Sequence, residues 1–157
     1  MVAALLAPRA PDRPLQSFRW PRLWSERRPL LERQHDRLEA QLEGMIERHS
    51  DGRVELDPAE ADHEWSEGNL LLRRLSQHLR LEERWLLQAD AFCVGHRASH
   101  RQAAERAIRA FRTGGHLRQA RMPWLLEIKE WFDHHRLGAD AIAYSRADRN
   151  GDASGGD

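Results

Sequence analysis

The chain of 157 residues has the usual length of one folded domain, and its 40% apolar residues are enough to build a core. Lysine plus arginine (25) balance aspartate plus glutamate (25), so the charge favours neither a nucleic acid nor a membrane as partner. No apolar run approaches the roughly 20 residues that span a bilayer, and the N-terminus makes a poor signal peptide. The single cysteine, Cys93, excludes an intramolecular disulfide and fits a reducing cytosol. We therefore expect a soluble, cytoplasmic protein.

The first 22 residues are predicted to form an extended arm. Pro8, Pro11, Pro14 and Pro21 are spaced so that no continuous helix can include them. Aromatic residues such as Trp20 indicate that the second half of the arm packs along the domain. We bound that domain at residues 23–147 and expect a disordered tail at residues 148–157, which are mostly glycine, aspartate and serine.

Two helices are predicted in the first half of the domain. The first begins between residues 25 and 29 and ends near residue 49. Its inward face reads Leu31, His35, Leu38, Leu42 and Met45. The second helix follows the capping pattern Asp57-Pro58-Ala59-Glu60 and continues to about residue 89. Its inward face reads Leu71, Leu75, His78, Glu82 and Trp85. The first half of this helix, with Glu64, is polar and is expected to be solvated.

Two more helices are predicted in the second half. The third begins at or near His96 and ends at residues 113–115. Its inward face reads His96, His100, Ala103, Ala107 and then Ala110 or Phe111. A basic loop at residues 113–122 precedes the fourth helix, which Pro123 opens and which continues to about residue 146. Its inward face reads Trp124, Ile128, Trp131, His135, Ala139 and Ile142. Short connections force neighbouring helices to be antiparallel, so the sequence predicts an all-α, up-down-up-down four-helix bundle with a proline-rich N-terminal arm.

Every predicted helix places a histidine at an inward position. A four-residue step stacks two side chains one turn apart, so His-x3-Glu and His-x3-His pairs can converge on one centre. Taken alone, each such histidine is more often a satisfied core or surface residue, but four helices with the same feature favour a metal site. Imidazoles with carboxylates suit iron, zinc, copper or manganese, and five imidazoles are too many for one tetrahedral zinc. Two metal ions fit better.

These residues resemble the hemerythrin family, including its bacterial single-domain members. The family pattern is a lone histidine on the first helix, His-x3-Glu on the second, His-x3-His on the third and His-x4-Asp on the fourth. The corresponding residues here are His35, His78 with Glu82, His96 with His100, and His135 with Asp140. The flanking residues Gln34, Glu83 and Trp131 agree with the family, and the resemblance covers residues 20–146.

Asp140 depends on the resemblance alone. In a regular helix a five-residue step turns it away from the face of His135, so periodicity does not select it. His134 fits neither spacing and is expected behind the ligands or at the surface. Two positions depart from the common family pattern: Glu32 replaces a frequent aspartate, and Ala103 replaces a frequent aromatic residue.

The resemblance implies a pair of iron ions with an oxo or hydroxo bridge. His96, His100 and His135 would hold one iron, and His35 and His78 the other. Glu82 and Asp140 would bridge the two ions. The iron with fewer histidines would keep a position open for dioxygen, which makes the protein an oxygen carrier, store or sensor and not primarily an enzyme. Its redox partner is unknown, and the sequence leaves open whether it is a monomer or a homo-oligomer.

Two alternatives stay open. The same scaffold could serve a peroxidase, an oxidase or a protein that handles nitric oxide. The histidines could instead be structural or bind zinc in a helical interaction module. The remaining histidines His49, His63 and His116 fall at a helix end, on a polar face and in a loop, and are expected to be exposed. The sequence has no glycine-rich phosphate loop and no nucleophile triad signature.

Overall fold

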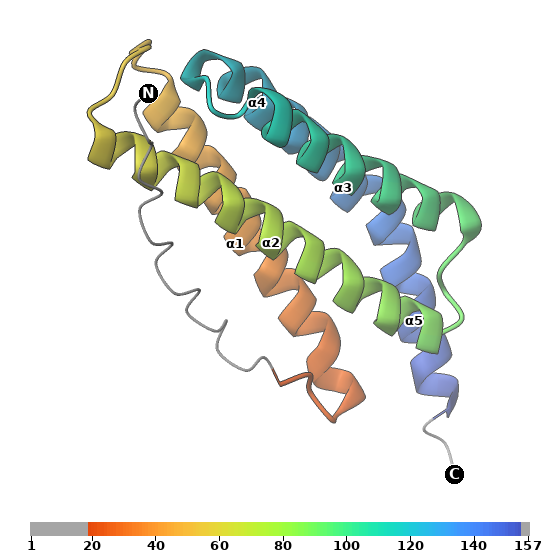
Figure 1. The fold of residues 1–157 in the computed structure, drawn as a ribbon. Coiled ribbons are helices and arrows are strands. Elements are labelled where there is room, and N and C mark those ends of the chain that lie inside the picture. Colours follow the sequence, from red (N-terminus) through yellow and green to blue (C-terminus); the bar gives the residue numbers. More distant parts are fainter. Residues whose placement is uncertain (1–18, 155–157) are drawn as a thin grey trace, which may run out of the picture.

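The computed structural model describes residues 19–154, and these residues form helices and connections without any strand. The expected all-helical class is therefore confirmed for this part of the chain (Figure 1). The elements in order are η1 (Trp24–Glu26), α1 (Arg27–His49), α2 (Pro58–Gln88), α3 (Val94–Gly114), α4 (Arg118–His135), the π-helix η2 (Arg136–Asp140) and α5 (Ala141–Ser154). Most of the predicted arm, residues 1–18, lies outside the described residues.

The predicted start of α2 is confirmed in detail. The Asp57 side chain accepts a hydrogen bond from the Glu60 backbone N–H at 2.9 Å, and the Glu60 side chain accepts one from the Asp57 backbone N–H at 3.2 Å. Pro58 fills the first helical position, where no backbone N–H is needed. α3 begins two residues before the expected His96, because Cys93 Sγ accepts a hydrogen bond from the His96 N–H at 3.4 Å and caps the helix.

The predicted start of the fourth helix is wrong. α4 begins at Arg118, inside the expected basic loop, and Pro123 lies within the helix. The reason is a buried set of ion pairs: Arg118 Nε and Arg121 Nη1 donate to Glu64 Oε2 at 3.1 and 2.8 Å. These contacts turn two arginines inward one turn apart and extend the helix toward the N-terminus. Glu64 is consequently buried, not solvated as expected.

His49 also differs from its expected exposure. It is buried at the end of α1, where its Nδ1 lies 2.7 Å from the Met45 carbonyl and its Nε2 lies 3.3 Å from Glu64 Oε2. His63 and His116 are exposed, as predicted. A cluster of buried charged groups around Glu64 therefore ties α1, α2 and α4 together at the end of the molecule near the α1–α2 connection.

The last helical segment is longer and more irregular than predicted. η2 interrupts the regular helix between α4 and α5 and shifts its register, so Ala143, Tyr144 and Ala147 face inward while the expected Ile142 is 67% exposed. α5 continues to Ser154, so the first part of the expected disordered tail is helical. Asp148 pairs with Arg28, and Asn150 Nδ2 donates to the Ala89 carbonyl at 2.7 Å. These contacts fix a polar segment that composition alone does not mark as folded.

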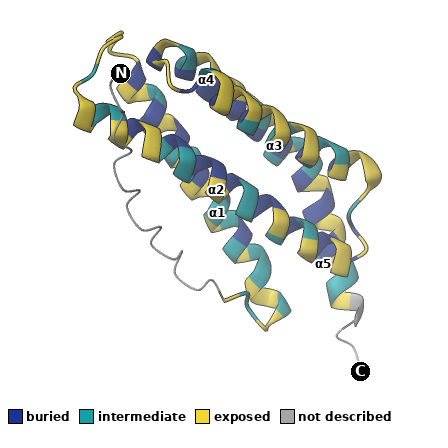
Figure 2. Cartoon of the chain, in the orientation of Figure 1, coloured by how far each residue is buried: buried dark blue, intermediate teal, exposed yellow. Residues whose placement is uncertain are grey.

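The helices pack in a closed order: α1 contacts α2 and α4, and α3 contacts the same two helices. Buried residues line the faces that the helices turn toward one another, and exposed residues cover the outside (Figure 2). Two separate apolar clusters result. One includes Leu38, Leu75 and Phe132, and the other includes Leu31, Trp85 and Tyr144. His35 lies between Leu31 and Leu38 on α1, so a band of polar residues separates the two clusters. Among residues 19–154, no helix is long and apolar enough to cross a bilayer.

Candidate metal centre

The seven residues selected from the sequence come together between the two apolar clusters. Each is at most 6% exposed, and they come from α1, α2, α3, α4 and the last residue of η2. They are His35, His78, Glu82, His96, His100, His135 and Asp140. Buried imidazoles and carboxylates on five consecutive helical elements are costly unless they are paired or hold a metal. This band is therefore the candidate functional site.

The site consists of two groups of donor atoms that share one carboxylate. Glu82, His96, His100, His135 and Asp140 form the first group, and His35, His78 and Glu82 form the second. Within each group the donor atoms all lie within 4.8 Å of one another. Each group is therefore close enough to contract around a metal ion.

Glu82 reaches both groups with different oxygens. Its Oε1 lies 3.5 Å from His96 Nε2 and 3.2 Å from His100 Nε2. Its Oε2 lies 3.5 Å from His35 Nε2 and 3.3 Å from His78 Nε2. One carboxylate thus separates two sets of imidazoles, with one oxygen directed to each set.

Asp140 repeats this arrangement. Its Oδ1 lies 2.9 Å from His96 Nε2 and 2.9 Å from His135 Nε2, while its Oδ2 lies 3.2 Å from His35 Nε2. The two carboxylates therefore run side by side between the same two sets of histidines. Carboxylate oxygens and imidazole nitrogens gathered in this way could hold a metal ion.

Side chains around the site select the tautomer of three histidines. Nδ1 of His78 lies 2.9 Å from Gln34 Oε1, and Nδ1 of His100 lies 3.1 Å from Glu83 Oε1. Nδ1 of His35 lies 3.5 Å from Glu32 Oε2. Because each Nδ1 can donate its proton outward, Nε2 of the neutral ring directs its lone pair into the centre. Gln34 and Glu83, singled out in the sequence, therefore contact site residues directly.

The donor atoms are arranged more favourably for binding a cation than for hydrogen bonding to one another. His135 Nε2 lies 3.0 Å from His96 Nε2 and 2.8 Å from His100 Nε2, which brings three imidazole nitrogens to one point. Nε2 of His78 and Oε1 of Glu82 are buried without a hydrogen-bond partner among the described residues. Converging lone pairs and unsatisfied buried atoms are what a bound cation relieves.

When no metal ion is bound, protons on some of the histidines balance the negative charge of the carboxylates. Burial alone would lower the pKa of His35, but contacts with the Asp140 and Glu82 carboxylates raise it to about 9. The same carboxylates raise the pKa of His96 to about 9 against the effect of its burial. Burial would raise the pKa of Asp140, but His135, His35 and His96 lower it to about 2. Burial lowers the pKa of His78. The Asp140 carboxylate is thus ionised and pairs with the cationic imidazoles of His35 and His96.

Sequence reasoning missed two residues at the site. Tyr144 Oη donates a hydrogen bond to Glu82 Oε2 at 2.7 Å, and burial together with the Glu82 charge raises the pKa of the phenol, which therefore stays protonated. The Phe132 ring lies 5.4 Å from His35 and 6.3 Å from His78, edge to face. Tyr144 lies four residues after Asp140, so the sequence would have placed it on the same helix face. This inference requires that Asp140 is first assigned to the buried face.

Trp131 contacts the site, whereas His134 does not. Trp131 stacks on His135, with 4.5 Å between the ring centroids and an interplanar angle of 20°. His134 is exposed and lies at the surface. The three-histidine group is therefore covered by an indole, whereas the two-histidine group is covered by Phe132 and Tyr144.

In comparisons with known proteins, no family model, no curated protein and no solved structure matches this chain. The class of this protein is therefore described from its fold and its buried residues. It is an all-helical protein with a buried group of five histidines and two carboxylates that could hold a metal ion.

Proposed function

We propose that this chain is a non-haem di-iron protein of the hemerythrin type that binds dioxygen reversibly, built on an up-down-up-down four-helix bundle. The observation that carries the proposal is the position of Glu82 and Asp140. Each directs one oxygen to the group around His96 and the other to His35. A single metal ion in one group of histidines would leave the contacts of these carboxylates with the other group unexplained.

The two groups differ in the number of nitrogen donors. His96, His100 and His135 would hold one iron, and His35 and His78 the other, with both carboxylates as bridges. The second iron would have fewer protein ligands and would keep a position for an exogenous ligand. Ferrous iron held by these residues would supply the electrons with which dioxygen binds.

The chain's own residues favour reversible binding. Phe132 and Tyr144 cover the two-histidine group, and apolar clusters lie on both sides of the site. Buried apolar walls exclude water and keep reductants from direct contact with the bound ligand, which limits its further reaction. The phenol of Tyr144 holds Glu82 by a hydrogen bond and limits its rotation.

The test is metal content followed by spectroscopy. Protein loaded anaerobically with ferrous iron should contain two irons per chain by elemental analysis. Exposure to air should produce a visible absorption band that disappears when oxygen is removed and returns on the next cycle. Irreversible conversion on first exposure would favour an oxidase or peroxidase instead. Retention of zinc but no iron would favour the structural alternative.

A matched pair of variants separates the site from other histidines. His78→Ala removes a buried imidazole of the two-histidine group, whereas His63→Ala removes an exposed imidazole of the same helix. We expect His78→Ala to lose iron and the reversible band, and His63→Ala to keep both. Glu82→Ala should lower the iron content sharply. If two irons per chain survive that change, the bridging role is wrong.

A further inference from the structure

A line of aromatic side chains connects the carboxylates with the surface near the start of α1. Tyr144 Oη donates to Glu82 Oε2 at 2.7 Å, and the Tyr144 ring lies 4.9 Å from Trp85 between centroids. The Trp85 ring lies 5.8 Å from that of Trp24. Tyr144 and Trp85 are buried, and Trp24 is partly exposed. The line therefore runs from Glu82 to solvent.

Packing alone does not account for the residue types in this line. Trp85 is fully buried, yet its Nε1 has no hydrogen-bond partner among the described residues. An unsatisfied buried N–H is costly, and an aliphatic side chain would fill the core without it. Tyrosine and tryptophan are the side chains that lose and regain one electron most readily, and here they are in sequential contact.

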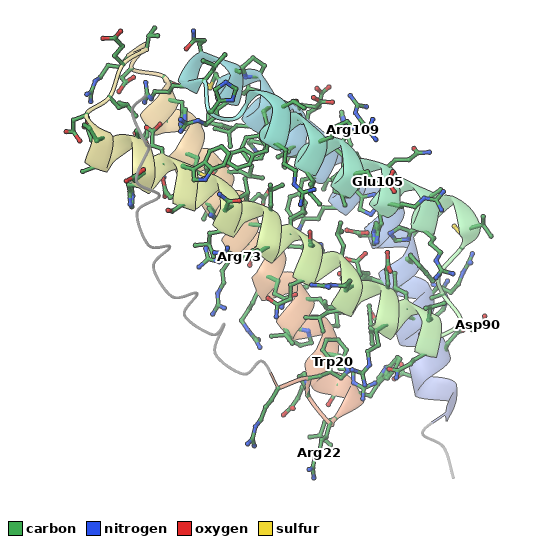
Figure 3. All side chains as sticks on the ribbon, in the orientation of Figure 1. Trp20, Arg22, Arg73, Asp90, Glu105 and Arg109 are labelled. Atoms are coloured by element: carbon green, nitrogen blue, oxygen red, sulfur yellow. The ribbon has the colours of Figure 1, made fainter. Side chains whose placement is uncertain are left out.

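The surface end of the line carries the guanidinium of Arg27, which has no carboxylate partner among the described residues. The Arg27 guanidinium lies 5.3 Å from the Trp24 ring and 5.5 Å from the Trp20 ring. Trp20 lies beside the start of α1, and Arg22 extends away from it into solvent (Figure 3). These arginines attract a small anion. A cation beside Trp24 also disfavours its oxidised form, so an oxidising equivalent is more stable deeper in the line, at Tyr144.

We propose that Tyr144, Trp85 and Trp24 form an electron relay through which an anionic one-electron reductant, such as ascorbate, serves the buried centre after its oxidation by hydrogen peroxide. The proposal rests on the proposed iron pair. It adds a peroxide-reducing activity and a reductant site at the surface around Trp24 and Arg27.

The electrons and protons balance along this line. Tyr144 loses one electron to the centre while its phenolic proton stays within the hydrogen bond to Glu82 Oε2. Trp85 returns an electron to Tyr144, and Trp24 then restores Trp85. One ascorbate monoanion restores Trp24 and releases a proton. Two such transfers reduce one hydrogen peroxide to two waters, consume two protons and leave two ascorbate radical anions.

The relay can be tested on iron-free protein, because the chain has a single tyrosine. Hexachloroiridate(IV), an anionic one-electron oxidant, is mixed with the protein, and the sample is frozen for electron paramagnetic resonance. We expect a tyrosyl signal, which can only come from Tyr144 and is lost in Tyr144→Phe. Trp24→Phe removes the entry of the relay and should lose most of the signal.

The control is Trp65→Phe, which removes a 38% exposed indole that lies outside the line and stacks on Phe111. It should keep the full signal. The relay is overturned if the unaltered protein gives no tyrosyl signal, or if Trp24→Phe and Trp65→Phe give the same signal. In iron-loaded protein, Trp24→Phe should also lose the formation of ascorbate radical on addition of peroxide. A chain that holds no iron would defeat the proposed function but would leave the iron-free result unaffected.

Discussion

His135 and Asp140 contact each other although they are five positions apart in the sequence, with 2.9 Å between His135 Nε2 and Asp140 Oδ1. The π-helix η2 lies between them and widens the turn. Residues five apart are therefore stacked, as residues four apart are stacked in a regular α-helix. The inserted residue also sets the register of α5, which brings Tyr144 to Glu82.

This relationship predicts an unusual tolerance to deletion. Removal of Gly138, whose position has open space around it, should convert η2 to regular α-helix and leave His135 and Asp140 one turn apart. We expect the variant to keep its metal content. Removal of the exposed Glu130 from the regular part of α4 should rotate the flanking segments by about 100° relative to each other and abolish metal binding. Equal loss of metal in both variants would show that η2 is not interchangeable with α-helix.

The sequence predicts which buried residues converge better than it predicts the helix ends. His35, His78 and Glu82 replace apolar residues in a regular 3.6-residue pattern, and Asp57 with Glu60 forms a local cap, so nearby residues alone reveal them. The inward position of Asp140 depends on a π-helix that no local pattern marks. The start of α4 likewise depends on Glu64, which is distant in sequence. The start of α4, which tertiary partners set, was therefore missed, whereas Asp140 was selected only through the family resemblance.

Loss of Gln34 should weaken the site without removing a ligand. Gln34 Oε1 lies 2.9 Å from His78 Nδ1 and keeps Nε2 of that ring free to bind a metal. Removal of such a partner typically lowers metal affinity by about 10- to 100-fold, so we expect this range for Gln34→Ala. Gln41→Ala is the matched control, because Gln41 lies on the same helix and accepts only from Arg74 among the contacts of the described residues. Competition with a chelator for ferrous iron measures both. Identical affinities in the two variants would contradict the role of Gln34.

Metal-free protein should be most stable in mildly acidic solution. The pKa of His35 and His96 is raised from 6.5 to about 9, so their contribution is complete below pH 6.5 and is lost as the pH rises through 9. The pKa of Asp140 is lowered from 3.8 to about 2, so its contribution is present above pH 3.8 and is lost as the pH falls through 2. Because the pKa of His78 is lowered, its contribution is lost as the pH falls below 6.5. Thermal unfolding in the presence of a chelator should therefore give the highest midpoint near pH 6.5.

Between pH 6.5 and 9, the affinity for a metal ion should rise while the stability of the metal-free protein falls. A metal ion must displace the protons of His35 and His96, so its affinity should increase between pH 6.5 and 9. Titration with ferrous iron under argon at several pH values measures the trend. An affinity that is constant over this interval would mean that the two histidines are already neutral before the metal binds.

The substitution Glu64→Ala should strongly destabilise the fold at the end distant from the metal site. Glu64 accepts from Arg118 and Arg121, and its loss would leave the buried Arg121 without a carboxylate partner and Arg118 with Asp51 alone. Breaking a buried pair in this way costs about 3–5 kcal/mol in the free energy of unfolding. Glu67→Ala is the control, since Glu67 pairs with the more exposed Arg48 and such a pair contributes about 1 kcal/mol or less. Denaturant unfolding compares them, and a small effect of Glu64→Ala would mean that water replaces the carboxylate.

Substitution of Gly68 tests how rigidly the aromatic residues near α3 are held. The side chain in Gly68→Ala would overlap the Phe111 ring, which is confined by Trp65 and Trp124 at centroid distances of 4.5 and 4.7 Å. Alanine in an exposed helix gains up to about 1 kcal/mol over glycine, but overlap in a packed core costs about 1–3 kcal/mol. We expect the overlap to dominate and the denaturant midpoint to fall. Gly44→Ala meets only the flexible end of Arg48 at 3.4 Å and should raise the midpoint. Equal stabilisation by both substitutions would show that Phe111 can move aside.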